Sequence, residues 1–204
     1  GVMKKFITIE GIDGVGKSTI SKKLAENMGA EFIQTPYFKK HAEKDCEDKF
    51  SYYLDDLIQL KSILKEELKE KTIICDRYIH STIAYQGNYI EPKLIMDKYD
   101  LLIPDLTVYL TVDEKTRLAR LKIRETQYNF VNELDHDYVH LKHVSSNFNK
   151  MKDMMIIDLV SAYPELKSYK FRGKLVGNKV VPYDSRAEIE RNPSKNLEVI
   201  AYVD

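Results

Sequence analysis

The sequence is poor in the features that mark membrane, disulfide-rich and nucleic-acid-binding proteins. It has no tryptophan and two cysteines, Cys46 and Cys75, whose separation suggests no metal-binding pair. No apolar run approaches the roughly 20 residues that span a bilayer, so we expect no membrane partner. The 32 basic residues balance the 32 acidic ones, which leaves no net field to attract nucleic acid. We expect a cytoplasmic protein, with Cys75 as a buried, inert thiol.

What the sequence does have is an alternation of strand and helix patterns in a chain of 204 residues, the size of one α/β domain. Short β-branched runs predict buried strands, and stripes with helical spacing follow most of them. The expected strands are 5–10, 31–34, 72–76 and 106–112, and the expected helices are 17–28, 50–71, 92–99, 114–124 and 132–155. This alternation predicts a parallel sheet with helices on both faces and ligands at the carboxyl ends of its strands.

The segment from Gly11 to Ser18 fits the pattern G-x-x-x-x-G-K-[ST], directly between an expected strand and an expected helix. Its glycines let backbone N–H groups surround phosphate oxygens, and the helix N-terminus adds its positive dipole end. Lys17 should reach the β- and γ-phosphates of ATP, and the Ser18 hydroxyl should ligate Mg²⁺. The fold expected is therefore the three-layer P-loop NTPase type. The expected ATP-binding residues are Gly11, Asp13, Gly14, Val15, Gly16, Lys17, Ser18 and Thr19.

A second polar group, Asp76-Arg77-Tyr78, ends the expected strand 72–76. Asp76 could hold Mg²⁺ there, and Arg77 could neutralise a phosphate with two parallel hydrogen bonds. A surface ion pair would give the same three residues, so the triplet alone does not decide between these interpretations. The triplet continues, however, into Ala84-Tyr85-Gln86-Gly87.

With these residues the chain resembles thymidylate kinases. Residues 6–19, FITIEGIDGVGKST, look like the opening of that family, and Asp76-Arg77-Tyr78 with Ala84-Tyr85-Gln86-Gly87 is similar to its second signature. The resemblance implies an enzyme that moves the γ-phosphoryl group of ATP onto a nucleoside monophosphate, with dTMP the first candidate. It also implies a homodimer.

The family assigns further roles by position. Asp13 would accept a hydrogen bond from the acceptor's 3′-hydroxyl, and Arg77 would bridge the transferring phosphate. Gln86 would read the edge of thymine with Tyr85 nearby. A planar base also needs an aromatic platform, for which Phe50 and Tyr53 on the long helix are candidates, although core packing is the favoured explanation for each aromatic.

Three arginines, Arg117, Arg120 and Arg124, share one face of the expected helix 114–124. The resemblance implies an arginine-bearing lid over ATP at about residues 117–135, in which Arg120 and Arg124 match better than Arg117. A solvated basic face is the alternative. The histidines at 136, 140 and 143 invite a metal interpretation, but no acidic or cysteine ligands complete it, and a solvated helix is favoured.

Two departures from the family affect the acceptor and the C-terminus. Gln34-Thr35-Pro36 replaces an Arg-Glu-Pro loop, and no arginine precedes Arg77, so Asp55 or Asp56 would face the acceptor's phosphate. Lys39, Lys40 or Lys49 could substitute only as point charges. A nucleoside kinase and a catalytically degenerate nucleotide-binding protein therefore remain alternatives. We expect residues 3–166 to form the kinase domain and 167–204 an extension packed on it, with a hairpin around Gly177-Asn178.

Overall fold

The computed structural model describes residues 4–38, 48–86, 88–111, 114–131, 137–158, 169–171, 173–176, 179–182 and 201–203. Strands and helices alternate through the first 158 residues, as the sequence predicts. In chain order they are β1 (Phe6–Glu10), α1 (Lys17–Met28), β2 (Glu31–Gln34), α2 (Lys49–Glu67), β3 (Ile73–Asp76), α3 (Ile79–Gln86), α4 (Pro92–Lys98), β4 (Leu106–Thr111), α5 (Glu114–Tyr128), α6 (Tyr138–Lys150) and β5 (Met155–Asp158). The helix expected over residues 132–155, however, ends at Lys150, and Met155 begins a strand.

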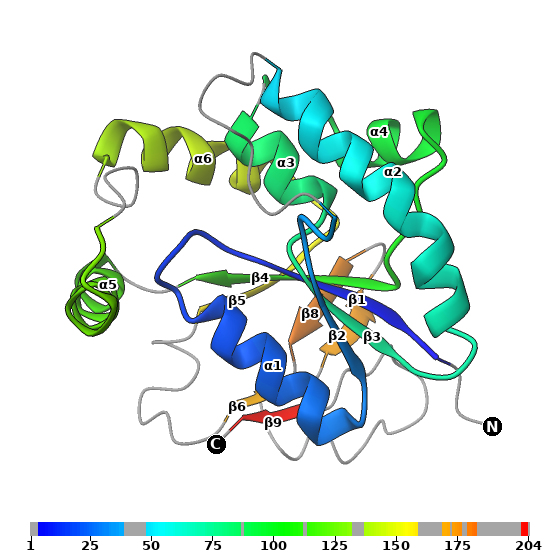
Figure 1. The fold of residues 1–204 in the computed structure, drawn as a ribbon, viewed down its shortest axis with the longest axis horizontal. Coiled ribbons are helices and arrows are strands. Elements are labelled where there is room, and N and C mark those ends of the chain that lie inside the picture. The colour runs from blue at the N-terminus through cyan, green and yellow to red at the C-terminus, as the bar shows by residue number, and fades with distance from the viewer. Residues whose placement is uncertain are drawn as a thin grey trace.

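The first five strands form one parallel sheet in the order β2-β3-β1-β4-β5. Strand β1, which leads into the glycine-rich loop, lies at the centre between β3 and β4. Helix α1 covers one face of the sheet, and α2, α3, α4 and α6 cover the other (Figure 1). The predicted three-layer α/β/α fold with a central parallel sheet is confirmed.

Alternate residues of β1 supply two separate cores. Ile7 and Ile9 point toward α1, where they pack with Leu24, whereas Phe6 points toward α2 and α3. Because side chains of a strand alternate between its faces, Glu10 lies on the same face as Phe6. Its carboxylate is therefore directed toward α3, beneath the second signature of the sequence.

Helix α3 was not predicted from the sequence. Six consecutive side chains, from Ile79 to Ala84, are buried, so the helix has no polar face to produce an amphipathic period. Its composition, with isoleucines and hydroxyl residues, also lacks strong helix formers. Tertiary packing against α2 and α6, not local propensity, accounts for this helix.

The C-terminal segments form two small antiparallel pairs: β7 (Gly173–Val176) with β8 (Lys179–Pro182), and β6 (Tyr169–Phe171) with β9 (Ala201–Val203). Val176 pairs with Lys179, which is the pairing expected of the hairpin predicted around residues 177–178. Strand β9 lies beside α1, and β8 lies beside β5 (Figure 1). Within the described residues, no helix has the length and apolar character needed to cross a bilayer.

Cys75, in the centre of β3, is fully buried, and burial raises the pKa of its thiol well above the ordinary value. Because the thiolate is the reactive form, we expect Cys75 to resist labelling. In a Cys46→Ser variant, Ellman's reagent at pH 8 should not modify the folded protein, and should modify Cys75 fully after unfolding in guanidinium. Rapid labelling of the folded variant would contradict the buried position of β3.

Candidate active site

The glycine-rich loop joins β1 to α1 at the carboxyl end of the central strand, where parallel sheets bind ligands. Gly14 and Gly16 both have a φ of 92°, a left-handed conformation that side chains disfavour. Gly16 is the N-cap of α1, so the helix N-terminus opens onto the loop. Val15 packs its side chain into the core and can offer a ligand only its backbone. Thr19 is exposed on the first turn of α1.

Lys17 and Asp76 bring the two predicted motifs together. The Lys17 ammonium donates to one carboxylate oxygen of Asp76, while Ser18 Oγ and Gln34 Nε2 donate to the other at 2.7 and 3.3 Å. Asp76 is fully buried and Lys17 nearly so. Burial, and next the Arg77 guanidinium, lower the pKa of Lys17, and Asp76 opposes that shift. The loop and the end of β3 thus form one charged cluster.

The residues predicted to hold Mg²⁺ fit such an ion. The hydroxyl of Ser18 and the carboxylate of Asp76 lie 2.7 Å apart and are both oxygen ligands. Mg²⁺ in phosphoryl-transfer sites is held by one or two carboxylates together with substrate phosphates and water. In the described part of the chain, no group of three or more His, Cys, Asp or Glu side chains could hold a metal. A site completed by ATP phosphates agrees with this set of side chains.

Arg77 lies beside the cluster and contacts the loop. Its Nη2 donates to Asp13 Oδ1 at 2.5 Å and its Nη1 to Ser81 Oγ at 3.0 Å, and its guanidinium lies 5.0 Å from the centre of the Tyr85 ring. Burial opposes the charge, yet Tyr85 and Asp13 keep the pKa of Arg77 above its ordinary value. Burial likewise raises the pKa of Tyr85 to about 12. The sequence placed Asp13, Arg77 and Tyr85 in one site, and the structure brings them together.

The backbone of Arg77 is itself unusual, with a φ of 74° in a residue other than glycine. Such a conformation is costly and persists only where neighbours hold it. The Arg77 N–H donates to Ile9 O at 3.0 Å, and Thr35 Oγ1 donates to Arg77 O at 2.8 Å. These bonds turn the guanidinium from the end of β3 toward the loop.

Glu10 is a buried carboxyl group that the sequence analysis did not identify as a site residue. Its position, at the end of an apolar strand next to the glycine-rich loop, could have indicated that it lies in the site. Its Oε1 accepts from the Tyr78 N–H at 2.8 Å, and its Oε2 accepts from Ser81 Oγ. The imidazole of His80 lies 4.0 Å away and reaches Asp153 on its other side at 3.2 Å. Desolvation raises the pKa of Glu10, and the nearby His80 opposes this most. Through Ser81, Glu10 is connected to Arg77.

The raised pKa of Glu10 predicts a loss of stability as pH rises. The folded state keeps a proton that the unfolded chain releases above about pH 4.5, so unfolding becomes easier with pH until Glu10 ionises in the folded state. One such group contributes at most about 1.4 kcal/mol per pH unit. In urea unfolding from pH 4.5 to 8, Glu10→Gln should flatten the slope, and the exposed Glu26→Gln should not. Equal slopes in Glu10→Gln and the unaltered protein would contradict the assignment.

The three arginines of α5 occupy different positions. Arg117, ranked lowest by sequence matching, is 1% exposed, and its Nη1 donates to the backbone oxygen of Asp13 at 3.2 Å. The side chain of Arg120 lies outside the described residues. Arg124 is exposed on the following turn. Arg117 thus has a hydrogen bond to the loop, and this contact was not predictable from helical spacing.

Of the predicted acceptor-side residues, Asp13 lies in the loop and Arg77 directly after β3, and the others lie on α2 and α3. Gln86 and Tyr53 are both half-buried, Gln86 at the end of α3, and the Tyr53 ring meets that of Tyr52 edge-on at 5.5 Å. Phe50 packs against the core beneath α2, which is the packing alternative stated for it.

Asp56 differs from the expectation that it could face the acceptor's phosphate. It is fully buried, and its two carboxylate oxygens accept from the N–H groups of Tyr37 and Phe38, each at 2.7 Å. The carboxylate therefore anchors the segment after β2. Asp55, its neighbour on α2, is half-buried and accepts from Gln59 at 2.8 Å.

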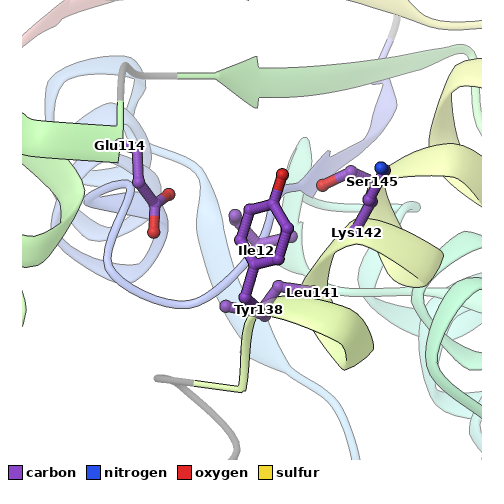
Figure 2. A pocket seen from close by; sticks show the side chains of 6 residues that line it. All are labelled: Ile12, Glu114, Tyr138, Leu141, Lys142 and Ser145. Atoms are coloured by element: carbon purple, nitrogen blue, oxygen red, sulfur yellow. The ribbon is translucent and has the colours of Figure 1, made fainter.

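Helix α6 lies beside the loop and forms one wall of a pocket there. His140 lies 5.9 Å from the ring of Tyr85, and His143 is 3.4 Å from the amide of Asn147; His136 lies outside the described residues. A pocket of about 200 Å³ opens between the loop, the start of α5 and α6 (Figure 2). Its lining residues are Ile12, Glu114, Tyr138, Leu141, Lys142 and Ser145.

The sequence and the fold are similar to those of known proteins. The thymidylate kinase family model matches residues 43–168. A probable thymidylate kinase from Staphylothermus marinus is 34% identical over 191 residues, which are 84% of this chain and 94% of that protein. One from Methanocaldococcus jannaschii is 33% identical over 155 residues, 67% of this chain and 80% of that protein. The fold is similar to thymidylate kinase from Candida albicans, with a TM-score of 0.55 and 21% identity, over 77% of this chain and 84% of that one.

The family model covers more than half of the chain, and the Staphylothermus relative covers most of it above 30% identity. The cluster around Lys17 and Asp76 lies where a parallel sheet binds its ligands, independently of these comparisons. The chain belongs to the thymidylate kinase family.

Proposed function

We propose that this chain transfers the γ-phosphoryl group of ATP to dTMP, which gives ADP and dTDP. The observation that carries the proposal is the cluster of the half-buried Ser18 with the buried Lys17 and Asp76 at the N-terminus of α1, in a chain of the thymidylate kinase family. A lysine that can reach phosphates, a hydroxyl and a carboxylate are the groups that this reaction requires.

The reaction needs positioning and charge more than covalent chemistry from the protein. An oxygen of the acceptor's phosphate bonds to the γ-phosphorus, and the bond from that phosphorus to the oxygen bridging to the β-phosphate breaks. Loop amides and Lys17 would hold the phosphates, and Ser18 and Asp76 would hold Mg²⁺. When bound, Mg²⁺ neutralises charge on the β- and γ-phosphate oxygens.

The site contains two ion pairs whose cations could exchange their carboxylate partners for phosphates when substrates bind. Lys17 is paired with Asp76, and Arg77 with Asp13, so each cation that would meet a phosphate is already beside an acid. Phosphates arriving at Lys17 and Arg77 would release the two carboxylates. Asp76 would then be available to Mg²⁺ and Asp13 to the 3′-hydroxyl of the acceptor. The cations are thereby kept in place without an unpaired buried charge.

The acceptor and lid residues are proposed by position within the family. Gln86 would read the edge of thymine, Tyr85 would lie beside it, and Tyr53 would contribute to the wall of the acceptor site. Arg120 and Arg124 would meet charge that develops on the γ-phosphate when the lid closes. Lysines remain the proposed partners of the acceptor's phosphate because no arginine precedes Arg77.

A coupled assay of ADP release tests the proposal. With Mg·ATP, the protein should release ADP on addition of dTMP, more slowly with dUMP, and not with thymidine. ADP release with thymidine alone would replace the proposal with a nucleoside kinase. Binding of ATP without turnover on any monophosphate or nucleoside would indicate a nucleotide-binding protein that has lost catalysis.

We propose Mg²⁺ as the metal, the cytoplasm as the location and a homodimer as the working form, all three from family membership. Chelation of divalent ions should abolish ADP release, and added Mg²⁺ should restore it. Sedimentation at micromolar concentration should give twice the mass of one chain, and a monomer there would remove the dimer from the proposal.

A further inference from the structure

Arg117 carries a buried positive charge at a place in the fold where such a charge is electrostatically unfavourable. It lies in the first turn of α5, where the helix dipole repels a positive charge, and it is 1% exposed. Glu114 meets it with two hydrogen bonds, from Arg117 Nε at 2.9 Å and from Nη2 at 2.7 Å. This fork offsets the buried charge. The other terminal nitrogen, Nη1, is directed at the loop, where it donates to Asp13 O at 3.2 Å.

The stem of Arg117 is also packed against the loop, at Gly14. A Cβ placed on Gly14 would lie 2.9 Å from Arg117 Cγ and 2.9 Å from Leu121 Cγ, closer than real Cβ contacts. Leu121 is fully buried one turn further along α5. The first two turns of α5 therefore rest directly on the loop backbone at Gly14.

The hydrogen bond to Asp13 O sets the orientation of a whole peptide group. In a trans peptide the carbonyl of one residue and the N–H of the next lie in one plane and point in opposite directions. With the Asp13 carbonyl held by Arg117, the Gly14 N–H points away from α5. A charged donor on the carbonyl also polarises the peptide and makes its N–H a stronger donor.

We propose that Arg117 is a positioning residue of the phosphate-binding loop, acting through the Asp13–Gly14 peptide to aim the Gly14 N–H at nucleotide phosphate. The inference rests on the proposed function, because it assumes that the loop binds a nucleotide. Asp13 is thereby held at two points: its backbone oxygen accepts a hydrogen bond from Arg117, and its carboxylate accepts one from Arg77. Arg117 touches neither substrate in this role.

The test measures binding of fluorescent Mg·ADP, which needs no acceptor and no turnover. Arg117→Met should weaken ADP affinity by about tenfold, the loss of one charge-assisted hydrogen bond and of the orientation that it fixes. Arg117→Lys keeps a charge and a donor and should recover part of that affinity. Lys122→Met, an exposed cation on the same helix, should bind as the unaltered protein does.

Glu114→Gln separates positioning from simple destabilisation. It removes the acid beside Arg117 but leaves the donor to Asp13 O, so it should lower the melting temperature while ADP affinity stays within about twofold. All affinities are compared below the melting transition of each variant. Equal weakening in Glu114→Gln and Arg117→Met, or unaltered affinity in Arg117→Met, would overturn the inference.

These outcomes are distinct from a failure of the proposed function. If the unaltered protein transfers phosphate to dTMP and Arg117→Met binds ADP equally well, only the role of Arg117 is lost. If the unaltered protein fails to bind Mg·ADP at all, the proposed function is wrong, and the role of Arg117 is refuted with it.

Discussion

Replacing Lys17 with methionine is expected to lower phosphoryl transfer to dTMP by about a thousandfold or more, since donors preorganised for developing charge are worth this much. The Lys17 ammonium is the charge that α1 presents at the loop, and it lies beside Asp76 in a site that solvent barely reaches. Methionine keeps most of the apolar stem but cannot donate to a phosphate oxygen. Chemistry should therefore be affected far more than folding.

The fold should survive although the substitution breaks a buried ion pair. Losing one partner of such a pair costs about 3–5 kcal/mol when the other charge is left alone. Here Asp76 retains the Ser18 hydroxyl and the Gln34 amide, which reduces that cost. Turnover with saturating dTMP and Mg·ATP, together with a thermal melt by circular dichroism, measures both effects.

Lys23→Met is the matched control, since Lys23 is an exposed lysine on the same helix. It should keep the turnover of the unaltered enzyme. A Lys17→Met protein whose turnover stayed within about tenfold of that value would show that the loop does not hold the reacting phosphates.

The order of strands and helices was predictable because its signals are local. The apolar run that forms β1, the glycine-rich loop and the helical stripe of α1 are adjacent in the sequence, and each fixes the boundary of the next. The strands β3 and β4 are likewise runs of mostly apolar or β-branched residues that are almost wholly buried. Helix α3 was missed because it is buried all round and its stability comes from packing, which no window of sequence reports.

The site was predictable only as far as contiguous motifs reach. Lys17 and Asp76 were placed at one site because both lie at the carboxyl ends of strands expected in a single parallel sheet. The structure adds that these strands, β1 and β3, are neighbours. The contacts of Arg117 with Asp13 join residues 104 positions apart, and no spacing rule on α5 indicates which of its arginines turns toward the loop. The orientation of a side chain depends on the packing of whole helices, and here the structure adds what the sequence lacks.

Replacing Asp56 with alanine is expected to lower the free energy of unfolding by about 2–5 kcal/mol, since each hydrogen bond to a charged group contributes about 1.5–3 kcal/mol. The carboxylate accepts hydrogen bonds from two backbone N–H groups, those of Tyr37 and Phe38. Alanine has no acceptor for either of them. Desolvation of the carboxylate in the unaltered protein offsets part of this loss. The segment after β2 should lose its anchor to α2.

Urea unfolding at neutral pH measures the loss, with Asp55→Ala as the matched control on the adjacent position. Asp55 is half-buried and bonded to an exposed glutamine, so its removal should cost less than about 1 kcal/mol. Asp56→Asn keeps one acceptor but turns its amide N–H₂ toward a backbone N–H. Its free energy of unfolding should therefore lie between those of Asp55→Ala and Asp56→Ala. Equal stability of the Asp55→Ala and Asp56→Ala variants would mean that the Asp56 carboxylate does not hold this segment. The expectation that Asp56 faces the acceptor's phosphate would then stand again.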